Sequence, residues 1–171
     1  MTDPQRTVDL RALTSTDSRP LETAFLALNK AASTFDRYVA EQAEVTRMCW
    51  VARSDGEIAG YVTLLWSSPY QGLAGSDTPE IQDLNVVPHL RRWGIGSRLL
   101  DEAEAAASTR SSTVAIGVGV HAGYNAAQRL YVLRGYVPDG KGLTYGDRYV
   151  GEYEDVTLDD SLVLHMTKEM R

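Results

Sequence analysis

Alternating apolar and polar residues open the chain. Over Thr7–Leu13 the apolar positions fall at every second residue or close to it, which predicts a first strand. The next residues, Thr14–Ser18, are typical helix-capping residues, and Pro20 suits a first helical turn. The helix predicted after them has an apolar face made of Leu21, Phe25, Leu26 and Leu28. A second helix is predicted over Phe35–Glu44, with apolar residues Phe35, Tyr38 and Val39.

Two further strands are predicted over Arg47–Arg53 and Glu57–Ser67. The residues between them, Ser54-Asp55-Gly56, are an Asp-Gly turn, so the two strands form a hairpin. Pro69–Pro79 is rich in glycine, serine and tyrosine and predicts a loop. Loops of this length often carry function, so Trp66 and Tyr70 are candidate aromatic residues of a substrate pocket, against the alternative of ordinary packing.

The centre of the chain predicts a strand, a loop, a helix and a second strand. The strands are Glu80–Val87 and Thr113–Val120, and the second is nearly continuous in apolar and glycine residues, as in a strand covered on both faces. The helix is Ser97–Ala107, with Leu99, Leu100 and Ala103 toward the sheet. Two strands joined through a helix predict a parallel pair with a right-handed crossover.

The last third predicts a helix over Gly123–Leu133, with Ala127, Leu130 and either Tyr131 or Leu133 facing inward. A strand begins at Tyr136-Val137, and Gly140–Asp155 shows no clear period. Leu158–Lys168 alternates and predicts a terminal antiparallel strand. Its edge leaves room for a homodimer.

Composition narrows the class of protein. The chain has 171 residues, of which 43% are hydrophobic, enough for one globular domain spanning residues 1–171. The net charge of −6 argues against nucleic-acid binding. No apolar run approaches ~20 residues, so no membrane span is expected. The single cysteine, Cys49, excludes an internal disulfide and favours a cytoplasmic setting, with a buried, inert thiol. The three histidines lack metal-ligand spacing, so no metal is expected.

The residues before the central helix carry the strongest chemical signal. Gly94-Ile95-Gly96 leads into the helix, whose first N–H groups have no carbonyl partner and lie at the positive end of the helix dipole. Glycine lets a ligand approach the backbone, and Arg91 and Arg92 add full charges. A phosphate or pyrophosphate suits such a site. A dinucleotide fingerprint would need a third glycine where Leu99 stands, and a P-loop would need Gly-Lys-Ser/Thr.

The spacing Arg91-x-x-Gly94-x-Gly96 after Leu84-x-Val86-x-Pro88 resembles the acetyl-CoA signature of the GNAT N-acetyltransferases. A second stretch, Asn125-x-Ala127-x-x-Leu130-Tyr131-x-x-x-Gly135-Tyr136, resembles the other hallmark of that family. The resemblance spans about a third of the chain. It implies an α/β (α+β) fold with one mixed, mostly antiparallel sheet of six to seven strands, a splayed parallel pair at its centre, and helices on both faces.

The same resemblance implies acetyl-CoA as co-substrate and an amine as acceptor, of a small molecule or a protein. The pantetheine arm would lie between the splayed strands, along Leu84 and Val86, with the Val86 N–H binding the thioester carbonyl. The amides of Arg91–Ser97, which include those of Arg92, Gly94, Ile95, Gly96 and Ser97, would hold the pyrophosphate. Asn125 would contact the cofactor from the other side.

The resemblance implies Tyr131 as the general acid, because a phenol with a pKa near ~10 stays protonated at neutral pH. The alternative is a tyrosine that only packs. The general base is open: several relatives carry glutamate where this chain has Gln82. Asp83 is the preferred candidate, as amine anchor or water-linked base; Glu80 is a second and could be a surface carboxylate. Strand alternation puts these two on opposite faces unless a bulge intervenes. His121 is a minor candidate, while His89 and His165 suit solvent or packing roles.

Two other functions stay open. One is a CoA-binding regulatory module that has lost turnover, for which Gln82 is the support. The other is a nucleotide-binding α/β domain, which would bind NAD or ATP and no CoA.

Overall fold

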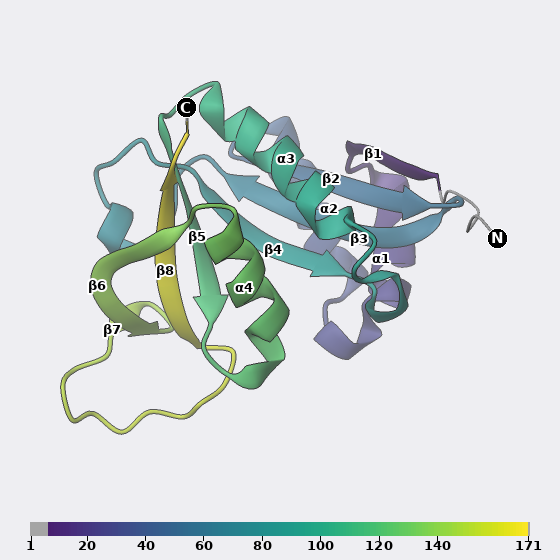
Figure 1. Cartoon of the computed structure of the whole chain (residues 1–171). Coiled ribbons are helices and arrows are strands. Elements are labelled where there is room, and N and C mark those ends of the chain that lie inside the picture. Colours follow the sequence, from purple (N-terminus) through teal and green to yellow (C-terminus); the bar gives the residue numbers. More distant parts are fainter. Residues whose placement is uncertain (1–6, 171) are drawn as a thin grey trace. The chain divides into compact units, whose positions relative to one another are not determined.

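The computed structural model describes residues 7–170, which form two compact units. The first comprises the described part of Met1–Leu65 together with Asp83–Ala105, and the second comprises Trp66–Gln82 with the described part of Ala106–Arg171. Strand β4, Glu80–Val86, passes from the second unit into the first between Gln82 and Asp83. Each unit therefore contains one part of β4 (Figure 1).

The first unit places strands β1 (Val8–Ala12), β2 (Arg47–Ser54) and β3 (Glu57–Leu65) in that order, followed by the second part of β4. The β1–β2 and β2–β3 pairs are antiparallel. The predicted hairpin turn is confirmed: Asp55 and Gly56 have φ values of 52° and 88°. Left-handed backbone at both central positions is what a type I′ turn requires, and Asp-Gly adopts it at low cost.

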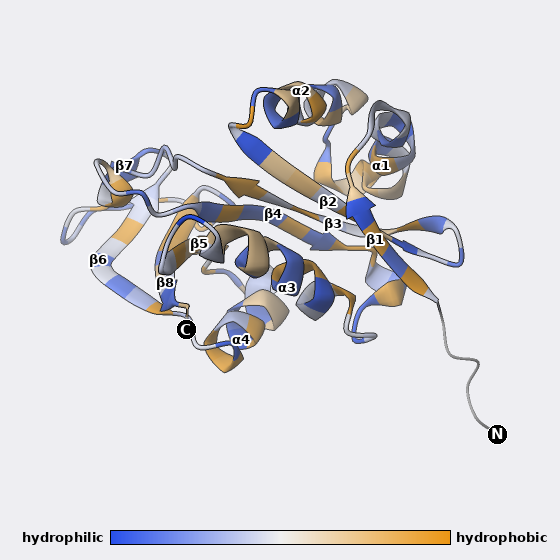
Figure 2. Cartoon of the chain, turned by 90° about the horizontal axis from the view of Figure 1, so that it is seen from above, coloured by the Kyte–Doolittle hydropathy of each residue, from blue (hydrophilic) through white to orange (hydrophobic). Residues whose placement is uncertain are grey.

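Helices cover both faces of this part of the sheet, as predicted. Figure 2 shows α1 (Ser18–Ala24) and α2 (Ala32–Ala43) on one face and α3 (Ile95–Ser108) on the other. On the first face, Tyr61 packs edge-on against Phe25 and Phe35, with ring centroids 5.1 and 5.3 Å apart. On the second face, the predicted inward residues Leu99, Leu100 and Ala103 are fully buried.

Close packing in this unit depends on a glycine in β3. A Cβ at Gly60 would lie 2.7 Å from the Asn85 carbonyl oxygen and 3.0 Å from Leu99 Cδ1. Real Cβ atoms do not approach backbone oxygen so closely, so glycine lets β3, β4 and α3 meet here.

One predicted helical face is wrong. Leu26 and Leu28 are exposed, because α1 ends at Ala24 and the chain continues as a short 3₁₀ turn, Leu26–Leu28, in a different direction. Leu21 and Phe25, earlier in the segment, are buried as predicted.

The second unit contains the first part of β4, then β5 (Thr113–Gly119), β8 (Leu162–Glu169), β6 (Val137–Tyr145) and β7 (Arg148–Tyr149) in that order. The parallel pair is confirmed: β4 pairs with β5 through Glu80–Ala115 and Ile81–Ile116. The strands β5, β8, β6 and β7 pair antiparallel. Helix α4 (Asn125–Leu133) follows β5 in the chain.

Of the two alternatives left open for the inward face of α4, the structure selects Tyr131, because Leu133 is exposed. Two other predictions for this unit need correction. Part of Gly140–Asp155 is strand, since β6 runs to Tyr145 and β7 follows, which makes eight strands in the described chain where six to seven were expected. The terminal strand β8 has no open edge, because β5 and β6 pair with its two sides, so it offers no edge for a homodimer.

Candidate functional site

The segment that carries the predicted phosphate site lies wholly in the first unit. After β4 the chain forms a 3₁₀ turn, Pro88–Leu90, and reaches α3 through Arg91–Gly94. Helix α3 begins at Ile95, two residues before the predicted start, so Gly96 lies inside its first turn. The Arg98 N–H donates to the Gly94 carbonyl, and the amides of Ile95, Gly96 and Ser97 precede that bond. Such amides have no carbonyl partner within the helix and can bind an anion.

Gly94 shapes this helix start through its backbone. Its φ is 77°, in the left-handed region, while a Cβ at this position would meet nothing within 4 Å. Glycine is therefore favoured by the turn itself, and the space beside its Cα is open. Arg92, also left-handed at φ 67°, and Arg91 are both exposed. The Arg91 Nε donates to the Val86 carbonyl at 3.2 Å, which holds that cation beside the end of β4.

The other predicted cofactor residues differ in what they can offer. The Ile95 side chain is buried, so only its backbone can face a ligand, and Leu84 and Val86 are partly buried along β4. Asn125 is exposed at the first position of α4, in the second unit.

Tyr131, the predicted general acid, lies on α4 and is almost fully buried. Its ring is tilted against that of Tyr136, with centroids 5.9 Å apart. Burial raises the pKa of the Tyr131 phenol far above its ordinary value, and the nearby Tyr124 adds to the shift. The phenol therefore keeps its proton at neutral pH, as a general acid must.

Asp83, the preferred base, lies within β4 and has left-handed backbone, with φ 51°. Its carboxylate forms an ion pair with Lys30 at 2.5 Å and accepts a hydrogen bond from Tyr38. Burial, followed by the Asp83 charge, raises the pKa of Tyr38 well above its usual value. The predicted anchor for a substrate amine thus already holds the amine of a lysine from the same unit.

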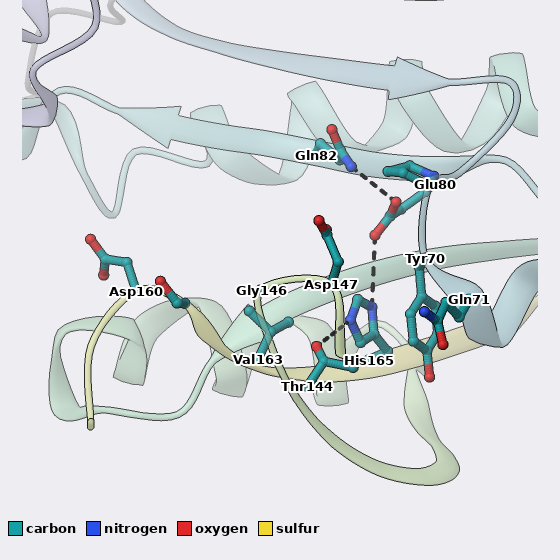
Figure 3. A pocket seen from close by; sticks show the side chains of 12 residues that line it. Tyr70, Gln71, Glu80, Gln82, Thr144, Gly146, Asp147, Asp160, Val163 and His165 are labelled. Carbon is teal, nitrogen blue, oxygen red and sulfur yellow. Dashed lines mark hydrogen bonds and ion pairs between the residues drawn. The ribbon is translucent and has the colours of Figure 1, made fainter. Parts of the chain in front are cut away.

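Glu80 is buried, which makes the surface-carboxylate interpretation wrong. Its Oε2 atom accepts hydrogen bonds from the Ser68 hydroxyl at 2.6 Å and from the Gln82 side-chain amide at 3.0 Å. Its Oε1 atom lies 3.8 Å from Nδ1 of His165, a residue expected to have only a solvent or packing role (Figure 3).

His165 is held in place by two neighbours. Its Nε2 atom is 3.0 Å from the Thr144 hydroxyl oxygen, and its ring stacks on Tyr70 at 3.5 Å between centroids, nearly parallel. Its Nδ1 atom is buried and has no hydrogen-bond partner in the described residues. Burial lowers the pKa of the imidazole, against a smaller upward effect of Asp139. The ring is therefore neutral at neutral pH.

These residues line a cavity of about 250 Å³ in the second unit (Figure 3). Its lining includes Tyr70, Gln82 and three carboxylates, and no lysine or arginine of the described chain is among its lining residues; the carboxylates are Glu80, Asp147 and Asp160. Tyr70, predicted as an aromatic residue of a substrate pocket, is among the residues that line this cavity. The sequence could not place His165, because no local pattern links a residue of the last strand to one some eighty positions earlier.

The remaining candidates lie elsewhere. Trp66 is covered by the guanidinium of Arg110, 3.8 Å from its ring centre, and is not among the residues lining the cavity. His121 is 2.9 Å from Asp160, whose carboxylate lines the cavity, and His89 is exposed in the 3₁₀ turn Pro88–Leu90.

Within residues 7–170, no group of three histidine, cysteine or acidic side chains could hold a metal ion. Cys49 is buried, and its burial raises the pKa of the thiol well above its ordinary value, consistent with the inert thiol that was predicted. The helices of the described chain are too short or too polar to cross a membrane.

Comparisons with known proteins agree with this picture. The chain resembles an N-acetyltransferase from Staphylococcus aureus Mu50, with a TM-score of 0.72 and 15% identity over 96% of this chain and 99% of that one. It also resembles yncA from Salmonella typhimurium, solved with its cofactor acetyl-CoA (0.69, 17%, 96% and 94%), and Arabidopsis thaliana NAA60 in complex with a bisubstrate analogue (0.70, 18%, 96% and 98%). At these identities the likeness establishes the fold. Among curated proteins none matches significantly. The model of the Acetyltransferase (GNAT) family matches residues 11–136, nearly three quarters of the sequence, and the chain belongs to that family.

Proposed function

We propose that this protein transfers the acetyl group of acetyl-CoA to a primary amine, by direct attack in a ternary complex. The observation that carries the proposal is the start of α3. There the left-handed Gly94, the two exposed arginines and the first amides of a long helix coincide with the acetyl-CoA signature of the family. That yncA was solved with acetyl-CoA, and NAA60 with a bisubstrate analogue, supports the same cofactor and reaction here.

The cofactor roles follow the family signature residue by residue. The backbone amides of Arg91–Ser97 hold the pyrophosphate, with Arg91 and Arg92 adding charge. Leu84 and Val86 accompany the pantetheine arm, and the Val86 N–H donates to the thioester carbonyl. Asn125 contributes from α4. We also propose that residues 1–171 act as one GNAT domain, because the family match runs through both units.

The chemistry needs two protons removed from the acceptor nitrogen and one supplied to sulfur. The acceptor ammonium first loses a proton to a base; the neutral nitrogen then attacks the thioester carbon, and the developing oxyanion accepts a hydrogen bond from the Val86 N–H. As the intermediate collapses, the nitrogen gives its second proton to solvent, the carbon–sulfur bond breaks and the thiolate takes the Tyr131 proton. Solvent then reprotonates Tyr131. No covalent enzyme intermediate forms.

Thiol release from acetyl-CoA, measured against a panel of small amines and amine-bearing peptides, tests the proposal. Tyr131→Phe removes only the hydroxyl, and we expect kcat to fall by about 10²- to 10⁴-fold with acetyl-CoA affinity within twofold. Tyr153→Phe is the matched control, because Tyr153 is 95% exposed. An unchanged kcat in Tyr131→Phe would remove Tyr131 from the mechanism.

The silent CoA-binding module remains the alternative, favoured by glutamine at position 82. Tight acetyl-CoA binding without turnover on any amine would support it. A thermal shift with NAD or ATP and none with CoA would favour the nucleotide-binding domain instead. The cytoplasmic setting stays a prediction.

A further inference from the structure

The cavity beside Glu80 combines negative charge with an unsatisfied polar atom. Three of its lining side chains are carboxylates, and its only basic lining residue in the described chain is His165, which burial keeps neutral. His165 is 8% exposed, and its Nδ1 atom is buried without a partner although the ring is fixed by Thr144 and Tyr70. A buried polar atom of this kind costs free energy unless a ligand or water satisfies it.

The tautomer of His165 decides which ligand can satisfy it. If the Nε2–H donates to the Thr144 hydroxyl, Nδ1 carries a lone pair and faces Glu80 Oε1 across 3.8 Å. Two acceptors would then face each other, which is unfavourable unless a donor lies between them. A primary ammonium has three N–H donors and a positive charge, and so can satisfy both.

The distance between Glu80 Oε1 and His165 Nδ1 is close to, but shorter than, the distance that a bridging ammonium needs. A nitrogen about 2.8 Å from both acceptors would see them at an angle of about 85°. The tetrahedral angle of ~109° would need a separation of about 4.6 Å, so an opening of about 0.8 Å gives good geometry for both hydrogen bonds. The observed gap is too long for a direct hydrogen bond and slightly short for a bridged one.

We infer that this cavity is the acceptor site, and that it binds the ammonium group of a small aliphatic amine between Glu80 and His165. This inference rests on the proposed function and names its substrate class. The volume of about 250 Å³ lies just below the range of ~300–1,000 Å³ that is usual for drug-sized ligands, which favours a small acceptor. The carboxylates of Asp147 and Asp160 favour an acceptor with a second cationic group, such as a diamine.

The pair also provides the proton acceptor that glutamine at position 82 cannot. The ammonium N–H bond breaks, its electron pair stays on nitrogen for the attack, and the proton moves to His165 Nδ1. Glu80 stabilises the imidazolium that forms, and Asp139 is the other charged group that acts on the ring. The neighbours Tyr70 and Thr144 are neutral. Gln82, donating to Oε2, keeps the Glu80 carboxylate oriented. His165 then returns the proton to solvent.

Binding is tested first without acetyl-CoA, by ligand-observed NMR titration with n-butylamine, 1,4-diaminobutane and n-butanol. We expect both amines to bind, the diamine more tightly, and the alcohol not to bind. Glu80→Gln should weaken amine binding at least tenfold, and His165→Asn should do the same. Asp77→Asn, which removes the same charge from an exposed position outside the cavity, should change it less than twofold.

Turnover provides the second readout. In His165→Asn the dependence of kcat/KM on pH should lose the limb that reports imidazole titration, while acetyl-CoA affinity stays unchanged. The site would be overturned if n-butanol bound as tightly as n-butylamine, or if neither Glu80→Gln nor His165→Asn changed amine binding. It would also be overturned if the protein acetylated peptides and no small amine. Amine binding at this cavity without thiol release would leave the site standing and defeat the proposed transferase. Thermal unfolding of each variant verifies that it is folded.

Discussion

Replacing Gly94 with alanine separates the two roles that this residue can have, in the turn and toward the cofactor. At φ 77° an alanine pays about 1–2 kcal/mol for the left-handed conformation. Alanine also lowers the conformational entropy of the unfolded chain, which offsets about 0.4–1 kcal/mol of this loss. Because the added Cβ meets nothing within 4 Å, no clash adds to this balance. We therefore expect a net loss of about 1 kcal/mol of stability, or a fall of about 2–4 °C in Tm for a chain of this size.

Cofactor affinity should change by much more. If the amides at the start of α3 bind the pyrophosphate, a methyl group in the open space at position 94 hinders the approach of the phosphate and weakens a hydrogen bond to a charged group, worth about 1.5–3 kcal/mol. That corresponds to a loss of about 10- to 150-fold in acetyl-CoA affinity, measurable by calorimetry together with KM.

Gly56→Ala is the matched control. Gly56 has φ 88°, open space around its missing Cβ, and a place in the same unit, in the turn between β2 and β3. It should lose the same stability and keep its acetyl-CoA affinity within twofold. Equal affinities in the two variants would refute the assignment of α3 as the pyrophosphate site, whatever happens to stability.

Two further substitutions test charges in the first unit. Asp17→Asn should cost about 3 kcal/mol at pH 7, because Asp17 is fully buried and accepts hydrogen bonds from Arg11 and Arg53, which would lose their counter-ion. Burial alone would raise the pKa of Asp17, but these hydrogen bonds outweigh it and hold the pKa well below 3.8. The stability that the ionised Asp17 contributes is therefore complete above pH ~4 and is lost as the pH falls toward the folded-state pKa. Denaturant unfolding should show a smaller difference in unfolding free energy between the original protein and Asp17→Asn at pH 3 than at pH 7. Lys30→Met removes the cation beside Asp83, and both side chains are about a quarter exposed. We therefore expect a loss of less than ~1 kcal/mol of stability and a KM for the amine that changes less than twofold. A many-fold lower KM would instead indicate that Asp83 is the amine anchor.

The elements that the sequence predicted well are those fixed by local chemistry. The inward face of α3 follows from the 3.6-residue period, and the β2–β3 turn follows from a dipeptide that tolerates left-handed backbone. The helix start at Ile95 was predicted to within two residues, because glycine and helix-forming residues meet there.

The start of β6 was predicted at Tyr136-Val137, but its continuation past Gly140 escaped prediction for a physical reason. Gly140 and Gly142 have φ values of 78° and 86°, and the pairing of β6 with β8 shifts register between Pro138 and Leu143. A shift of register breaks the alternation of inward and outward residues, so a real strand shows no period of two. The alternation of apolar and polar residues is absent from this part of β6 because its backbone is irregular.

The candidate base illustrates a different limit. The sequence favoured Asp83 over Glu80 as the candidate base, because Asp83 lies next to Gln82, the position at which several relatives carry glutamate. The choice between the two carboxylates depends, however, on the charges that folding brings close to each. Asp83 already has a cation, Lys30, at 2.5 Å, so an incoming ammonium would have to displace it. Ser68 and Gln82, which donate hydrogen bonds to Glu80, are neutral, and the cavity that Glu80 lines has three carboxylates and no lysine or arginine among its lining residues in the described chain. A positively charged acceptor therefore gains more electrostatic free energy beside Glu80, and burial of the site amplifies that gain because water screens it less.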